Sequence, residues 1–160
     1  MTAPAPRRTR TWAGGTDERG QMGGIEGLVF GVLVFVFGTL LVANAWGVID
    51  AKLATTSAAR EAARTYVEAP SAAAAGPAAE DAAYRAIEDQ GRTRSRAHPR
   101  LVPGSTFARC RRVTIEVSYD VPLIAIPLLG QAGTGITVSS RHSEIVDPYR
   151  SGLPGTAACR

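Results

Sequence analysis

The chain has 160 residues, a mean hydropathy of zero and a net charge of +4, so it is long enough for one ordinary domain with a tail or an anchor, and too short for two independent domains of usual size. The charge is unevenly distributed, because residues 27–49 carry none and the main basic excess lies within residues 80–112. The basic isoelectric point therefore reflects a local arginine cluster, which argues against a uniformly basic protein.

Residues 1–24 form a basic tail, and residues 25–49 are predicted to form a transmembrane helix. The uncharged run 27–49 would extend about 35 Å as a helix, enough to cross a hydrocarbon core of about 30 Å. Basic residues before the run favour a cytoplasmic N-terminus at the plasma membrane and an extracytoplasmic C-terminal region; they are Arg7, Arg8, Arg10 and Arg19. Trp46 fits the outer headgroup level.

The same segment has an alternative interpretation as a cleaved secretory signal. The basic tail, the apolar run and Ala43-Asn44-Ala45 match the three parts of such a signal, with cleavage after Ala45. The apolar run is at the long limit for a signal, and a helical pattern continues beyond it. We therefore expect a retained membrane span.

Residues 50–69 are predicted to continue the helix as an amphipathic segment, giving one helix of about 45 residues. Its apolar stripe is expected at three- and four-residue steps, along Ile49, Leu53, Thr56, Ala59, Ala63, Tyr66 and Val67. Because the stripe is mostly alanine, it buries little area and needs a partner surface.

Residues 70–112 are predicted to contain a low-complexity joint over 70–77, a short helix over Ala78–Gln90 and an irregular, arginine-rich loop. Pro77 suits the start of that helix and Gly91 suits its end. Residues 113–160 are predicted to form a small antiparallel β region with a C-terminal tail.

Two strands are expected in this last region. In the first, Val113, Ile115, Val117 and Tyr119 alternate with polar residues, as in a half-buried strand; residues 136–146 would be its partner. The apolar ten-residue segment 121–130, which contains two prolines, either packs on the sheet and helix or touches the outer leaflet or a partner protein. The predicted fold is α+β and membrane-anchored, with the sheet packed on the amphipathic half of the long helix.

The sequence offers no catalytic motif, no metal-ligand spacing and no phosphate-binding loop, so a non-enzymatic protein without cofactors is expected. Cys110 and Cys159 would lie in an oxidising compartment, where they either pair or remain two free thiols. The arginine-rich loop is either a solvated segment or a contact for anionic polymer, DNA or lipid through Arg92, Arg94, Arg96 and Arg100. Nucleic acid is not the expected partner, because aromatic stacking residues are lacking there.

Small residues within the span suggest helix–helix assembly. Gly24, Gly31, Gly38 and Ala45 recur every seven residues, and Gly27 adds a four-residue spacing with Gly31. Such a seam lets another helix approach closely, although a chain this rich in glycine could show it by coincidence. Glu26 stands at the head of the span, where a carboxylate needs a cation or the interface.

Several of these elements together resemble the TadE-like proteins of the tight-adherence pilus machinery. The resemblance covers about residues 17–67 and rests on Glu18-Arg-Gly20, Glu26 and Ala58-Ala-Arg-Glu-Ala-Ala-Arg64. It implies a non-enzymatic minor pilin or pilus assembly factor with membrane lipid and other pilin or assembly subunits as partners. It also implies cleavage by a prepilin peptidase between Gly20 and Gln21; Glu26 would then be the sixth mature residue, where the family has it fifth.

Overall fold

The computed structural model describes residues 23–124 and 135–159, with side chains from residue 25 onward. These residues divide into two compact units, the helical part of residues 1–39 and the larger unit of residues 40–160. The expected α+β architecture is confirmed, since a long N-terminal helix, a second helix and a small antiparallel sheet are all present.

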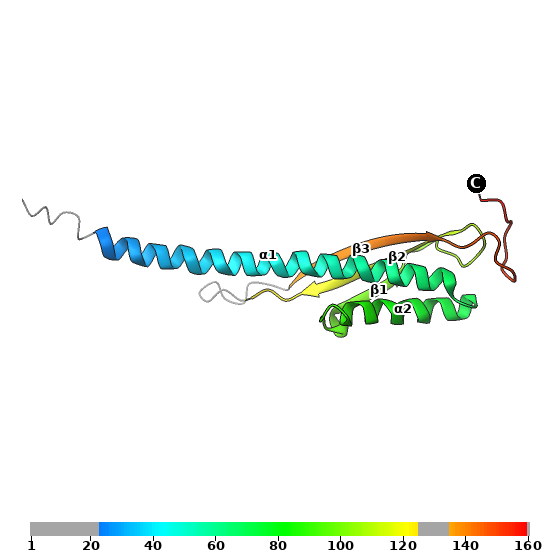
Figure 1. Cartoon of the computed structure of the whole chain (residues 1–160), viewed down its shortest axis with the longest axis horizontal. Coiled ribbons are helices and arrows are strands. Elements are labelled where there is room, and N and C mark those ends of the chain that lie inside the picture. Colours follow the sequence, from blue (N-terminus) through cyan, green and yellow to red (C-terminus); the bar gives the residue numbers. More distant parts are fainter. Residues whose placement is uncertain (1–22, 125–134, 160) are drawn as a thin grey trace, which may run out of the picture. The chain divides into compact units, whose positions relative to one another are not determined.

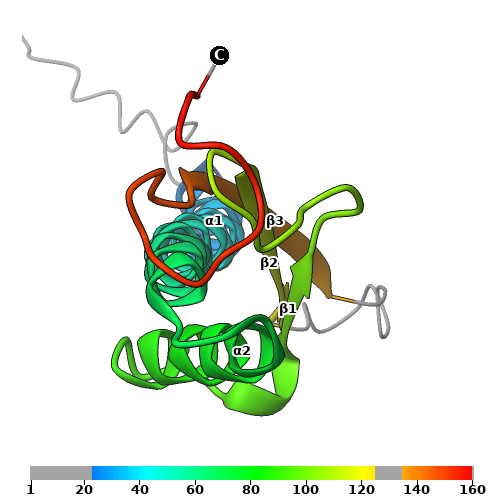
Figure 2. The same cartoon turned by 90° about the vertical axis from the view of Figure 1, so that its right-hand side faces the viewer.

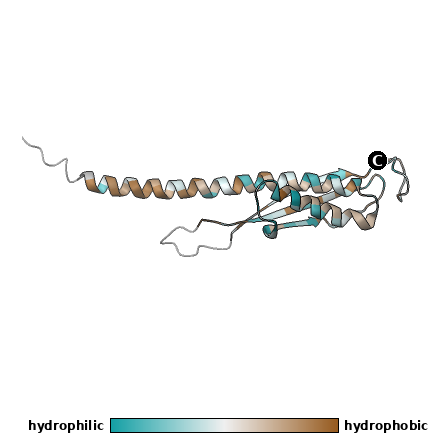
Figure 3. Ribbon diagram, turned by 60° about the horizontal axis from the view of Figure 1, so that its bottom comes forward, coloured by the Kyte–Doolittle hydropathy of each residue, from teal (hydrophilic) through white to brown (hydrophobic). Residues whose placement is uncertain are grey.

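The long helix α1 runs from Gly23 to Glu68 without interruption. Glu26 lies in its first turn, where a carboxylate complements the positive end of the helix dipole. Strong helix formers fill its second half, and Pro70 follows its end. Figure 3 shows the N-terminal half of the helix as predominantly apolar and its later turns as mixed.

Among the described residues, α1 is the helix that is long and apolar enough to cross a membrane. None of its most apolar window is buried within the protein. Its large side chains are instead exposed, as at Phe30 and Phe35, which are 69% and 73% exposed. A helix of this length with apolar side chains on all faces is typical of a membrane span.

The covered face of α1 differs from the predicted stripe. Ile49 and Leu53 are exposed, and the buried line consists of small residues: Ala51, Ala54, Thr55, Ala58, Ala59, Ala62 and Ala63. The prediction was wrong for Ile49 and Leu53, because over residues 51–63 the contact is made by small side chains, which allow close approach of the neighbouring elements. It was correct for Tyr66, whose large ring is buried near the end of the helix.

The second helix, α2, spans Ala72–Glu88 and starts six residues earlier than predicted. Ser71 caps its N-terminus, with its side chain accepting a hydrogen bond from the Ala74 amide. The following alanines are strong helix formers, so the segment interpreted as a joint is helical, and Pro77 lies inside the helix. Ala75, Ala79, Ala82, Ala83 and Ile87 form its buried face.

Within the described residues, the strands β1 (Ala97–Leu101), β2 (Arg112–Val121) and β3 (Ile136–Ile145) form an antiparallel sheet in the order β1-β2-β3. A short 3₁₀ helix, η2 (Arg94–Arg96), leads into β1. Strand β1 lies in the segment that was predicted to be irregular. It is an edge strand, so the missing N–H of Pro99, which is opposite Val117, is tolerated.

The sheet and the two helices form two layers in the larger unit (Figures 1 and 2). The predicted inward face of β2 is confirmed, with Val113, Ile115, Val117 and Tyr119 all buried against the helices. Beyond that face, Tyr66 of α1 packs edge-on against Phe107, with ring centroids 5.7 Å apart. The opposite face of β2 is polar.

The C-terminal end of α1 is completed by Arg150 in the tail. Its guanidinium donates hydrogen bonds to the carbonyl oxygens of Val67 (2.6 Å), Glu68 (3.3 Å) and Ala69. The last turn of α1 contains no basic residue, so this distant side chain supplies the positive charge and the donors that the helix end lacks.

Replacing Arg150 by Ala should destabilise the larger unit by about 1–2 kcal/mol, because three carbonyl groups lose a charged donor. Hydrogen exchange on the full chain in detergent should show faster exchange in the last turn of α1, whereas Arg150→Lys should retain part of the protection. Unchanged exchange near Glu68 in Arg150→Ala would show that the cap is dispensable.

Candidate membrane anchor and assembly surface

The glycines proposed for helix assembly lie along an open part of α1. A Cβ atom added at Gly27, Gly31 or Gly38 would meet no atom within 4 Å, and Ala45 is exposed. Gly24 belongs to the same helix. Glu26 is exposed, while Gly20 and Gln21 lie outside the described residues. The helix is therefore accessible to a neighbour at each of the sites whose surroundings are described.

Arg92 follows the end of α2 and binds that part of the chain to the long helix α1. It donates to Asp50 Oδ2 at 2.5 Å and to the Gly47 carbonyl at 3.2 Å, and its guanidinium lies 5.3 Å from the centre of the Tyr119 ring. Only 13% of its side chain is exposed. These contacts join α1, the segment after α2 and strand β2 at one point.

Gly91 directs the chain toward that contact. Its φ of 69° lies in the left-handed region, which glycine adopts without a Cβ clash. The turn lets the Arg92 amide donate to the Ile87 carbonyl at 3.2 Å, in the manner of a helix C-cap. The glycine expected at the end of the second helix thus positions the arginine that follows it.

Two of the other arginines proposed for anion contact, Arg94 and Arg100, also have partners within the protein. Arg94 lies 4.1 Å from the centre of the Tyr84 ring and 4.0 Å from Asp81, and Arg100 donates to Glu116. Arg96 is exposed. Arg92 and Arg94 face an open hollow of 820 Å³ that also contains Glu80 and Glu88, so its lining is of mixed charge.

The polar face of the sheet is organised around Glu116 on the central strand. Register places Arg100 of β1 and Arg141 of β3 on either side of it, and both donate to its Oε2, at 2.8 and 2.7 Å. Burial alone would raise the pKa of Glu116, but the hydrogen bonds and charges of Arg141 and Arg100 outweigh it and hold that pKa below its ordinary value. The carboxylate is therefore charged at neutral pH and links all three strands.

Asp120 forms a second link on the same face. Thr137 donates to Oδ1 at 2.6 Å, and His98 lies 3.2 Å from Oδ2. These hydrogen bonds, first that of Thr137 and then that of His98, lower the pKa of the carboxyl. Strand β2 thus uses two acidic residues to hold both of its neighbours.

Cys110 and Cys159 form a disulfide with their Cα atoms 4.9 Å apart. They are separated by 49 positions, so the bond ties the C-terminal tail to the segment before β2. Closing a loop of this length stabilises a fold by up to about 4 kcal/mol in the chain-entropy account.

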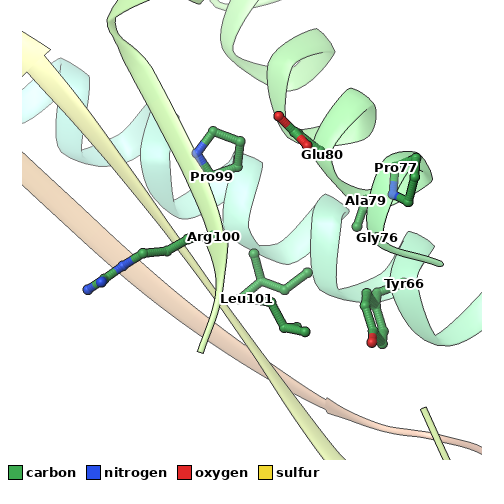
Figure 4. Close-up of a pocket in the computed structure, with 9 residues that line it drawn as sticks. Tyr66, Gly76, Pro77, Ala79, Glu80, Pro99, Arg100 and Leu101 are labelled. Carbon is green, nitrogen blue, oxygen red and sulfur yellow. The ribbon is translucent and has the colours of Figure 1, made fainter. Parts of the chain in front are cut away.

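An apolar hollow of 280 Å³ lies between the end of α1, the start of α2 and strand β1 (Figure 4). Tyr66, Pro77 and Leu101 contribute apolar surface, and Glu80 supplies a carboxylate in the lining. Within residues 25–124 and 135–159, no group of three or more potential ligands could hold a metal ion.

The chain matches none of the family models, curated proteins or solved structures with which it was compared. Evidence for the function therefore comes from the residues and their geometry.

Three sets of contacts were not predicted from the sequence: those of Arg92 with α1, those of Arg150 with the C-terminal end of α1, and those of Glu116 with its two arginines. Alternation in β2 places Glu116 on the polar face, but β1 was not predicted and its Arg100 therefore had no assigned position. The side-chain hydrogen bonds of Arg92 and Arg150 connect residues 42 to 83 positions apart, and they leave no local pattern in the sequence.

Replacing Glu116 by Gln should destabilise the larger unit by about 1 kcal/mol at pH 7, a modest value because both arginines are 63% exposed and screened by water. Because folding lowers the pKa of Glu116, its contribution is present above the ordinary value of 4.5 and is lost as the pH falls through the folded-state value. The unfolding free energies of the unsubstituted protein and of the Glu116→Gln variant should therefore converge at acidic pH. A difference that stays constant from pH 7 to pH 3 would contradict this origin.

Replacing Arg92 by Ala should lower the unfolding free energy by about 1–3 kcal/mol, because the change removes a charge-assisted hydrogen bond to Asp50 and the additional side-chain donor to the Gly47 carbonyl. Thermal unfolding of the full chain in detergent measures the loss. Arg96→Ala is the matched control, since Arg96 is exposed and should change stability by less than about 0.5 kcal/mol. Equal effects of the two substitutions would refute a special role for Arg92.

Proposed function

We propose that this chain is a non-enzymatic, single-span protein of the plasma membrane that acts as a TadE-like minor pilin or pilus assembly factor. The observation that carries the proposal is α1 itself, an uninterrupted helix whose first half is apolar on its exposed surface and whose second half packs on a small sheet. This is the arrangement implied by the resemblance over residues 17–67.

In the proposed orientation the N-terminal tail is cytoplasmic and the larger unit is outside. The arginines of the tail favour this orientation. The disulfide between Cys110 and Cys159 supports it independently, because such bonds persist in oxidising compartments outside the cytoplasm.

Assembly would occur side by side through the spans. The open surface at Gly27, Gly31 and Gly38 would let a neighbouring backbone approach closely. Glu26 of one subunit would then meet a cation of the next, either Arg19 or a free amino group, in a low-dielectric setting where an unpaired carboxylate is costly. Other pilin or assembly subunits are the proposed partners, and a prepilin peptidase would cut after Gly20.

Replacing Glu26 by Leu should reduce recovery of the chain in pilus or assembly complexes at least several-fold, because the proposed ion pair between subunits is lost. Complexes would be cross-linked in cells and quantified, and N-terminal sequencing of the membrane-bound protein would show whether it begins at Met1, Gln21 or Trp46.

Glu26→Asp is the matched control, since it keeps the charge and should retain most assembly. Unfolding of the larger unit should be the same in both variants. Wild-type recovery of the Glu26→Leu protein would refute the electrostatic mechanism, and a start at Trp46 would refute membrane anchoring altogether.

A further inference from the structure

We propose that the end of the sheet where β2 leaves toward β3 binds lipid of the outer leaflet, so that the larger unit contacts the membrane independently of the span. We call this the sheet-end surface and define it by Pro122, Leu123, Ile124 and Ile136. The inference rests on the proposed single-span anchoring, which supplies the bilayer.

A hydrogen bond between the sheet-end surface and α1 fixes the position of this surface along the helix axis, and hence its depth in the proposed bilayer. The Ile124 amide donates to Asn44 Oδ1 at 2.8 Å, and the Asn44 amide group in turn donates to the Leu40 carbonyl at 2.9 Å. Asn44 lies within the uncharged run 27–49, six residues before Asp50. At 1.5 Å per residue, Ile124 is bound about 9 Å below the first charged residue of the emerging helix.

Along the axis of α1, the charged residues of β2 end at about the same level as the charged residues that follow the uncharged run of the helix. Arg92 contacts both Asp50 and the Tyr119 ring, so the last charged residue of β2, Asp120, lies near the level of Asp50. Below it, Val121 approaches Gly47, where an added Cβ would lie 3.9 Å from Val121 Cγ1. The sequence carries no charged side chain from residue 121 to residue 140.

The side chains at this level suit lipid better than water. Ile124 is 53% exposed, Ile136 is 44% exposed, and Trp46 on α1 is 70% exposed. An exposed tryptophan and exposed isoleucines at one level are typical of the headgroup boundary. The Asn44 side chain also satisfies the Ile124 amide, and a backbone donor at that depth needs such a partner within the protein.

Lipid is the occupant favoured by these observations because the sheet-end surface begins below the charged residues of both α1 and β2. A protein partner bound there would have to enter the bilayer beside α1. The apolar hollow near Leu101 is not a candidate for the same lipid contact. Leu101 pairs with Ile115, which lies nine positions before Ile124 along the chain.

The experiment uses the full chain in vesicles of phosphatidylcholine and phosphatidylglycerol. A single cysteine, introduced as Ile124→Cys or Ile136→Cys, is labelled with an environment-sensitive fluorophore while the native cysteines remain in their disulfide. Quenching by spin-labelled lipid, with the nitroxide near the ester end of the acyl chain, reports contact with the outer leaflet.

Matched controls give the reference values. Leu33→Cys lies in the span, Leu101→Cys is an apolar and partly exposed position elsewhere on the sheet, and Tyr149→Cys is an aqueous position that is 86% exposed. Labels at Ile124 and Ile136 should be quenched several-fold more than those at Leu101 and Tyr149.

The possible outcomes separate the two proposals. If Leu33 is quenched and both sheet-end labels behave like Leu101, the lipid contact is overturned and the span stands. Blue-shifted emission at Ile124 without quenching would identify a protein contact and also overturn it. If Leu33 itself escapes quenching, membrane anchoring fails and the lipid contact fails with it.

Discussion

The close packing of an alanine face of α1 against the sheet and α2 is the constraint on which the rest of the larger unit depends. Alanine allows backbones to approach but removes little apolar area from water, so this contact contributes less hydrophobic stabilisation than one made of leucines would. The buried line of α1 includes Ala51, Ala54, Ala58 and Ala62, each with no exposed surface. The fold therefore relies on further ties between its layers.

These additional contacts are polar, and each involves a defined position along α1. Arg92 binds Asp50, the Lys52 ammonium donates to the Ser139 carbonyl, and the hydroxyls of Thr55 and Thr56 each lie 3.0 Å from that of Ser140. Farther along, Arg150 caps the helix end. An alanine surface alone would allow the sheet to slide, whereas directional hydrogen bonds fix one register. That register determines which end of the sheet lies beside the end of the span.

The sequence predicted the elements whose signals are local and strong. The long apolar run, the uninterrupted helix and the alternation in β2 each follow from side chains that are neighbours in the chain. The predicted start of α2 rested on Pro77, which suits a first helical turn, whereas the helix begins directly after the cap at Ser71. Strand β1 was missed because its proline and charged residues resemble a loop, and its stability comes from pairing with β2 and from Arg100 contacting Glu116.

The covered face of α1 was mispredicted for a different reason, and that reason bears on assembly. Periodicity identifies an apolar stripe but does not say which partner will cover it. Here the alanines face the protein's own sheet, while Ile49 and Leu53 remain exposed one and two turns after Trp46. A single-span subunit that assembles through its helix, as proposed, needs separate surfaces for its own outer domain and for its neighbours. Over residues 49–63 side-chain size provides that separation, because alanine suits the close internal contact while Ile49 and Leu53 are left available for an external one.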